Sequence, residues 1–146
     1  MWTVEIGINN ILRPGLPLRD IVDNVFWASI ALFILMTAIY YTRKTGKISQ
    51  GIISGFWSGL SSGAVACLTA LILIVFGMNL ILADPLNIRE WSDVKANTDF
   101  PGMAVYFAFQ TLAGAIMHLV ILGAVMGLIL GLIGGLTGKA LNMVIK

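Results

Sequence analysis

Long apolar stretches alternate with short polar ones along this chain, and the alternation predicts three helices that cross a membrane. The first apolar run, VFWASIALFILMTAIYY, lies within a predicted span of residues 21–42. The second run predicts a span of 51–83, and the third predicts a span of 102–138. A helix needs about 20 apolar residues to cross a bilayer. The second and third runs are longer, so we expect their helices to tilt, break or project from one face.

The remaining segments are polar connections between these spans. In lipid, backbone groups must find hydrogen-bond partners within the segment, which favours helices over open strands. The sequence therefore predicts an all-α integral membrane protein forming a single membrane domain. Its other parts are an external or interfacial segment, two loops and a tail, at 1–20, 43–50, 84–101 and 139–146. Residues 86–94 are compatible with a short amphipathic helix anchored by Trp91 or with an ordinary solvated connector.

Glycines recur at every fourth position in the second and third predicted spans. They are Gly51, Gly55, Gly59 and Gly63 in one span, and Gly123, Gly127, Gly131 and Gly135 in the other. The hydrophobic effect does not drive helices together in lipid, whereas small residues allow close backbone packing. In antiparallel neighbours both sets lie at the same depth, so we expect the two helices to form a glycine-zipper hairpin. Pairing of the same faces between copies, which would give a homo-oligomer, is the alternative.

The distribution of charge predicts how the spans are oriented. The first loop and the tail together carry five basic residues and no acidic one. All seven acidic residues, with four basic ones, fall in the N-terminal part of the chain or in the second loop. Loops rich in Lys and Arg stay cytoplasmic, which predicts an external N-terminus and a cytoplasmic C-terminus, in the cytoplasmic (inner) membrane if the protein is bacterial. Aromatic residues mark the two interfaces, Tyr40 and Tyr41 on one side and Trp2, Trp27 and Trp91 on the other.

Composition agrees with the membrane assignment. The chain is 58% hydrophobic and only 11% charged, whereas soluble domains carry about 25% charged residues. The formal net charge of +2 gives no indication of nucleic-acid binding. A lone cysteine, Cys67, excludes an intramolecular disulfide and a cysteine metal site, and we expect it to be a small buried hydrophobic residue.

His118 is the ionisable side chain that stands out within the apolar runs, and such groups are candidates for function. Helical geometry places Thr111 and Gly114 on its face and the spaced glycines on the opposite side. One role is a neutral imidazole bonded to a backbone carbonyl or to a hydroxyl such as Ser29 or Thr37; a proton or substrate role is another. A third role is ligation of haem or chlorophyll. The stretch LAGAIMHLVIL resembles the small-x-x-x-His pattern with which antenna helices ligate chlorophyll, which implies that Gly114 leaves room for a macrocycle.

No nucleophile–base pair, metal-ligand cluster or phosphate-binding loop is present, so we expect a protein that is not an enzyme. Isolated polar residues could line a polar path, namely Gln110, Asn79, Thr69 and the serines of the second span. The sequence favours an accessory or structural subunit of a larger membrane complex, such as a bioenergetic or photosynthetic one. Expected partners are the lipid bilayer and other membrane subunits or copies of the chain itself, without nucleic acid.

Two alternative functions remain open. Three spans, an external N-terminus and a basic tail resemble one class of phage holins, which implies a self-assembling pore or channel. The environment of His118 allows a tetrapyrrole carrier as the second alternative.

Overall fold

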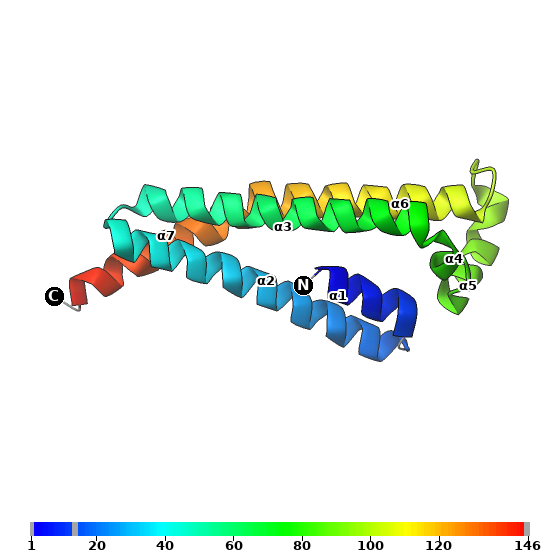
Figure 1. The fold of residues 1–146 in the computed structure, drawn as a ribbon, viewed down its shortest axis with the longest axis horizontal. Coiled ribbons are helices and arrows are strands. Elements are labelled where there is room, and N and C mark those ends of the chain that lie inside the picture. Colours follow the sequence, from blue (N-terminus) through cyan, green and yellow to red (C-terminus); the bar gives the residue numbers. More distant parts are fainter. Residues whose placement is uncertain (1, 13–14, 145–146) are drawn as a thin grey trace.

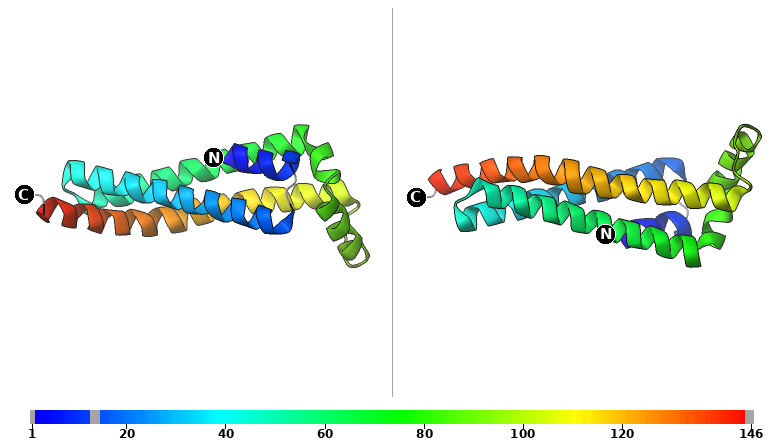
Figure 2. Two further views of the ribbon diagram at one scale, coloured as in Figure 1. Left: turned by 90° about the horizontal axis from the view of Figure 1, so that it is seen from below. Right: turned by 90° about the horizontal axis from the view of Figure 1, so that it is seen from above.

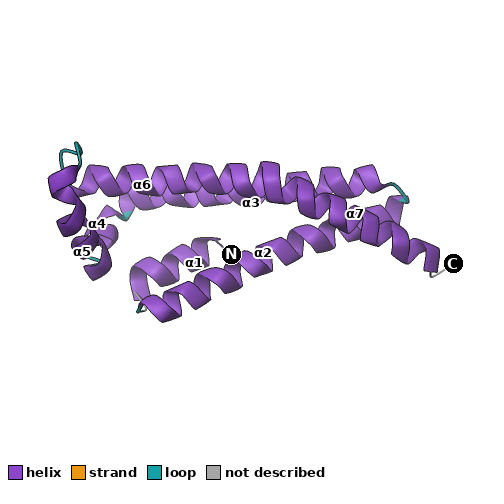
Figure 3. Cartoon of the chain, turned by 180° about the vertical axis from the view of Figure 1, so that it is seen from behind, coloured by secondary structure: helices purple, strands orange, loops and turns teal. Residues whose placement is uncertain are grey.

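The computed structural model describes residues 2–12 and 15–144, and every regular element in them is helical (Figure 3). The long elements are α2 (Leu16–Thr45), α3 (Ile48–Phe76) and a continuous third long helix formed by α6 (Met103–His118), the π-helical segment η3 (Leu119–Met126) and α7 (Gly127–Val144). The short ones are α1 (Trp2–Gly7), the π-helical turn η1 (Ile8–Leu12), α4 (Met78–Leu82), α5 (Pro85–Val94) and the 3-10 turn η2 (Lys95–Asn97). Three helices are long and apolar enough to cross a membrane, which confirms the prediction of three candidate spans.

The molecule is an elongated bundle whose two ends differ in charge. We call one end the basic end, because it holds Arg43, Lys44, Lys47 and Lys139. The other is the acidic end, where α4 and α5 lie (Figure 1). The third long helix and α3 run side by side for most of the length of the bundle (Figure 2). Near the basic end α2 packs against both, and toward the acidic end it diverges from α3 (Figure 1).

Close approach of α3 and the third long helix depends on positions without side chains. A Cβ added at Gly55 would lie 2.5 Å from the Cα of Gly131, and one added at Gly59 would collide with the carbonyl of Leu122. All eight regularly spaced glycines are buried. Toward α2, a Cβ at Gly134 would lie 2.7 Å from that of Ala38. Larger residues at these positions would push the helices apart.

The backbone carbonyls at the C-terminal end of α2 receive hydrogen bonds from Gly46, a glycine in the left-handed conformation, and from side chains of α7. Gly46 has φ 72°, and its N–H donates to the carbonyl of Thr42 at 2.7 Å. From α7, Lys139 Nζ donates to the carbonyl of Gly46 at 3.1 Å, and Asn142 Nδ2 donates to that of Arg43 at 3.0 Å. Terminal helix carbonyls need such partners. The turn between α2 and α3 is therefore tied to α7.

The second apolar run forms two helices rather than one. At Gly77 the helix α3 ends, and the chain turns into α4 and then α5 (Figure 1). Asp84 begins α5, because its side chain accepts the backbone N–H of Leu86 at 2.9 Å and Pro85 occupies the first turn. An acceptor before the first turn and a proline within it are both typical of helix starts. Of the two alternatives for residues 86–94, the structure contains the helix.

The third long helix changes its winding immediately after His118. Residues 119–126 are π-helical, and within them the fully buried Leu122 accepts the N–H of Gly127, five residues later. Long π-helical stretches are rare, and they occur frequently at functional sites.

The N-terminal segment packs against the chain's own helices. Its helix α1 lies between α2 and α3 where these diverge (Figure 1). The hydroxyls of Thr3 and Thr69 lie 3.3 Å apart, and Asn9 Nδ2 donates to Asp23 Oδ1 at 2.8 Å. Because α2 begins at Leu16 rather than near residue 21, much of the expected external segment belongs to the bundle. The side chain of Trp2, predicted to be interfacial, lies outside the described residues.

Candidate functional site

Two hollows between the helices gather polar side chains of the long helices. The first, here called the groove, measures about 700 Å³ and lies between α2 and α3. The second, here called the cavity, measures about 400 Å³ and is lined by residues of α2, α3 and α6 together with side chains from α4 and α5. The groove lies nearer the basic end, and the cavity lies nearer the acidic end.

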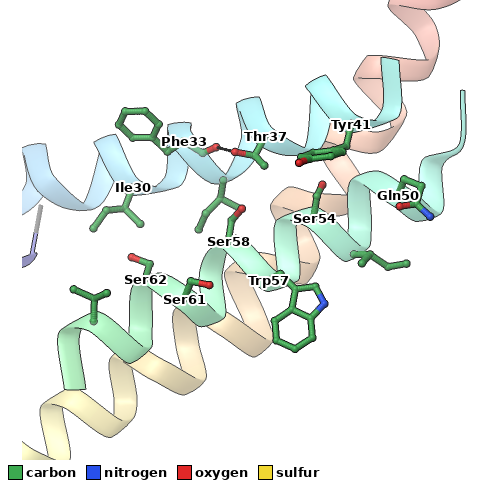
Figure 4. A pocket seen from close by; sticks show the side chains of 13 residues that line it. Ile30, Phe33, Thr37, Tyr41, Gln50, Ser54, Trp57, Ser58, Ser61 and Ser62 are labelled. Atoms are coloured by element: carbon green, nitrogen blue, oxygen red, sulfur yellow. Dashed lines mark hydrogen bonds between the residues drawn. The ribbon is translucent and has the colours of Figure 1, made fainter. Parts of the chain in front are cut away.

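A row of serine hydroxyls lines the groove. Ser54, Ser58 and Ser62 follow one face of α3 and point toward α2 (Figure 4). Ser54 donates to a carbonyl of its own helix at 3.0 Å, and Thr37 on α2 does the same at 2.8 Å (Figure 4). Within the described part of the chain, Ser58 and the exposed Ser61 make no hydrogen bond. The groove therefore presents hydroxyl donors and acceptors beside apolar side chains.

Helix α1 occupies the neighbouring part of the same opening between α2 and α3. Its Thr3 meets Thr69, which lies on α3 beyond the groove-lining Val65. One section of the opening is thus filled by a helix of the chain itself, with a contact between two hydroxyls. The section lined by Ser58 and Ser62 is open.

The cavity brings together the three residues that share a face in the sequence analysis, namely His118, Thr111 and Gly114. The Nδ1 of His118 lies 2.7 Å from the carbonyl oxygen of Gly114, the geometry of an N–H donating one turn back along the helix. The imidazole lies against the indole of Trp27, with ring centroids 4.9 Å apart and an interplanar angle of 36°. The rings of Trp27 on α2 and His118 on α6 thus meet in the lining of the cavity.

The hydroxyls considered as partners of His118 bond within their own helix. Ser29 donates to the carbonyl of Val25 at 2.7 Å, and Thr37 to that of Phe33 at 2.8 Å. Hydroxyls commonly satisfy themselves in this way inside helices. Of the expected arrangements for His118, the contact with a backbone carbonyl is present.

Two carboxylates line the cavity from different elements. Glu90 on α5 accepts hydrogen bonds at one oxygen, Oε1, from Tyr106 Oη and Gln110 Nε2, both at 2.8 Å. Asp23 on α2 accepts from Asn9 at its Oδ1. Neither carboxylate forms an ion pair with a basic residue in the described part of the chain. Both carboxylates are therefore hydrogen-bonded to uncharged side chains.

An ion pair connects the helices at the acidic end, beside the cavity. Arg19 Nη1 lies 3.4 Å from Oδ2 of the buried Asp84, and the same guanidinium donates to the carbonyl of Asn9 at 3.2 Å. Because Asp84 also begins α5, this pair connects the start of α2 to α5 and to the N-terminal segment. The charge of Arg19 is therefore balanced by a carboxylate outside the cavity lining.

The remaining polar residues do not form one continuous path. Gln110 lines the cavity and the serines line the groove, whereas Asn79 and Thr69 line neither hollow. Cys67 is partly buried, and its Sγ donates to the carbonyl of Ala115 at 3.1 Å.

Sequence reasoning did not assign Asp23 and Glu90 to this cavity. Asp23 stands one helical turn before Trp27, a spacing that places both side chains on one face of α2. This spacing could have predicted that Asp23 and Trp27 line the same site. For Glu90 no comparable signal exists, because it reaches the cavity from α5 through the fold of the second loop.

The aromatic residues predicted at interfaces lie in different surroundings. Tyr40 and Tyr41 are exposed near the basic end, with Lys44 Nζ 6.0 Å from the ring centroid of Tyr40. Trp91 contacts Tyr106 at the acidic end, with ring centroids 5.6 Å apart. Trp27 lines the cavity instead of standing alone at a surface. An interfacial role for these residues stays a prediction.

Metal-ligating side chains do not gather in groups of three or more anywhere in residues 2–12 and 15–144. The arrangement offers hydrogen bonding in the groove, and charge with aromatic contact in the cavity. No protein-family model matches this sequence, and neither a curated protein nor a solved structure gives a significant match.

Proposed function

We propose that this protein is a non-catalytic, accessory subunit of a larger membrane assembly, and that its groove receives a transmembrane helix of a different subunit. The observation that carries the proposal is the row of serine hydroxyls, Ser54, Ser58 and Ser62, on the open wall of the groove. Polar groups in the spans favour partners that can hydrogen-bond to them.

The orientation in the membrane is part of this proposal. Basic residues at one end of the bundle and acidic residues at the other support a cytoplasmic basic end and an external acidic end, in the cytoplasmic (inner) membrane if the protein is bacterial. The contacts of Gly55 and Gly59 with the third long helix support a glycine-zipper hairpin. This hairpin would be the rigid part of the subunit, from which α2 diverges to form the groove.

A helix suits the groove better than a lipid chain does. From Gln50 to Val65 the groove follows α3 for about 22 Å at about 1.5 Å per residue, enough for four turns of a partner helix. An acyl chain offers no hydrogen bond to a hydroxyl, whereas bonds between helices contribute about 0.6 kcal/mol each on average. In the neighbouring section of the opening, helix α1 already lies between α2 and α3, with a contact between the hydroxyls of Thr3 and Thr69. This arrangement supports a helix as the occupant of the groove.

A different subunit fits the shape better than a second copy does. In a two-fold pair the same surface meets itself, so two concave grooves would face each other and leave a space between them. A head-to-tail contact between copies would instead add subunits repeatedly and give a ring or a filament. A convex helix from another chain fills the groove once.

Site-specific photocrosslinking tests the proposal in native membranes. A photoreactive phenylalanine analogue at Ser58 or Ser61 should give an adduct with one dissimilar chain, whereas the exposed Ile133 of α7 serves as the matched control. Ser58→Trp should fill the groove and abolish co-purification of that chain at a fixed ratio, and Ile133→Trp should not. Adducts joining two copies of this protein would instead favour self-assembly, and adducts with lipid alone would contradict the proposal.

A further inference from the structure

We propose that the cavity at the acidic end binds an organic cation, a protonated amine or quaternary ammonium group attached to an apolar body. This inference is independent of the groove, because the two hollows lie in different parts of the bundle. It rests on the charge of the lining, on the aromatic pair and on an unfilled position beside His118.

The lining carries negative charge without a matching cation. Arg19 is the one Lys or Arg side chain among the described residues that line the cavity, and its partner is Asp84. Asp23 and Glu90 each use one carboxylate oxygen in the hydrogen bonds described above, and their second oxygens have no partner among the described residues. Both side chains are partly buried, and a partly buried carboxylate attracts a nearby positive charge more strongly than a carboxylate in bulk water does. A cationic ligand would supply that charge.

The aromatic and apolar residues of the lining suit the rest of such a ligand. Trp27 and His118 form its aromatic side, and Phe107, Ala66 and Ala70 add apolar surface. An indole attracts cations through its face, more strongly when water is excluded. The volume of about 400 Å³ falls within the range of roughly 300–1,000 Å³ found for small-molecule sites. A lining that combines carboxylates with aromatic and apolar side chains suits an amphiphilic ligand.

Gly114 indicates that space is kept beside His118. In the third long helix every glycine from Gly123 to Gly138 would bring an added Cβ within 3.1 Å of another atom, so these glycines serve helix contacts. A Cβ added at Gly114 meets nothing within 4 Å. Glycine lowers helix stability by about 1 kcal/mol relative to alanine, and close packing does not explain it here. Its effect is to leave the cavity wall flat.

Two sources can supply this cation, a soluble amine or the headgroup of a choline or ethanolamine lipid. The test uses benzyltrimethylammonium as the probe, with its neutral carbon isostere neopentylbenzene as the control. Binding is measured by isothermal titration calorimetry on the full chain in nanodiscs of phosphatidylglycerol. We expect the cation to bind and the isostere to bind at least tenfold more weakly. Repeating the titration in nanodiscs containing phosphatidylcholine then identifies the source, because a headgroup ligand will compete and a soluble amine will meet no competitor.

Variants locate the binding. Asp23→Asn and Glu90→Gln should each weaken binding about tenfold, as expected for loss of one nearby opposite charge. Asp93→Asn, an exposed acid on the same helix as Glu90, should leave it unchanged. Gly114→Leu should block the cavity, and Gly114→Ala should weaken binding without loss of thermal stability. Absence of binding, equal binding of the neutral isostere, or equal affinity of all four cavity variants and wild type would overturn the proposal.

Discussion

The two halves of this bundle are built from the same three helices, yet in one half α3 and the third long helix meet backbone to backbone, whereas in the other a cavity opens between the three helices. Near the basic end, α3 and α7 approach until backbone meets backbone at Gly55 and Gly131. Near the acidic end, α2 diverges and the cavity opens between it, α3 and α6. The buried positions of α3 change in the same direction, from glycine up to Gly63 to alanine at Ala66 and Ala70. Both alanines line the cavity. The change from glycine to alanine on α3 therefore coincides with the change from direct helix contact to a cavity.

The comparison separates two uses of small residues in apolar helices. Where a neighbouring backbone fills the space, glycine is a packing residue, and a larger side chain is excluded by contact. Where an added Cβ meets no atom of the chain within 4 Å, as at Gly114, packing does not exclude a larger side chain, and only a bound ligand would. The two classes are distinguished by substitution, and the following predictions run from the largest expected effect to the smallest.

Gly55→Ala should cost about 3 kcal/mol, the upper part of the usual range for overpacking. Its new methyl group would lie 2.5 Å from the Cα of Gly131, and a backbone atom cannot move aside as a side chain can. The measurement is reversible unfolding in bicelles. Gly114→Ala is the matched control, for which we expect equal or slightly higher stability. If both variants lost the same stability, the distinction between the two halves would be wrong.

Asp84→Ala should cost about 2 kcal/mol, because it removes both the N-cap of α5 and the partner of Arg19. The loss should appear as faster amide exchange in α5 and at the start of α2, with α7 unaffected. Asp93→Ala, at an exposed position of α5, is the control and should change little. Uniform destabilisation of the whole bundle would show that the acidic end is not an independent region.

Thr42→Val should leave stability unchanged or raise it by up to about 1 kcal/mol. The hydroxyl of Thr42 is fully buried in the closely packed half and has no hydrogen-bond partner among the described residues. Valine keeps the shape and removes the unsatisfied oxygen. Thr37→Val, which loses a bond to the carbonyl of Phe33, should be slightly destabilising in the same unfolding assay. A clear loss for Thr42→Val would point to a partner for this hydroxyl that the described residues do not supply.

The sequence was sufficient to predict the three apolar helices, because hydrophobic length reports directly on the ability to cross a bilayer. For residues 86–94 it left two alternatives, a short helix anchored by Trp91 and a solvated connector, of which the structure contains the helix. The common face of His118, Thr111 and Gly114 followed from helical spacing alone. These features are local, so neighbouring residues determine them.

The rest depends on contacts between distant segments. Hydropathy does not distinguish a continuous helix from one that ends at Gly77, since the residues on both sides are equally apolar. It also cannot show that α1 folds back against Thr69, or that Glu90 reaches the cavity of Asp23 from another element. Each of these results from tertiary packing, which overrides a one-dimensional pattern.

The π-helical segment between His118 and Gly127 has a consequence for how this chain tolerates changes of length. Wider winding there amounts to about one extra residue, or roughly 100° of rotation between the two parts of the helix. Deleting one residue from 119–126 would restore regular α-helical winding, while the glycine contacts of α7 with α3 would hold α7 in place. Helix α6 would then turn about its axis, and Met117 would take the position of His118 opposite Trp27. A single missing codon in this segment would thus exchange an imidazole for a thioether at the cavity wall, although the deleted residue itself does not line the cavity.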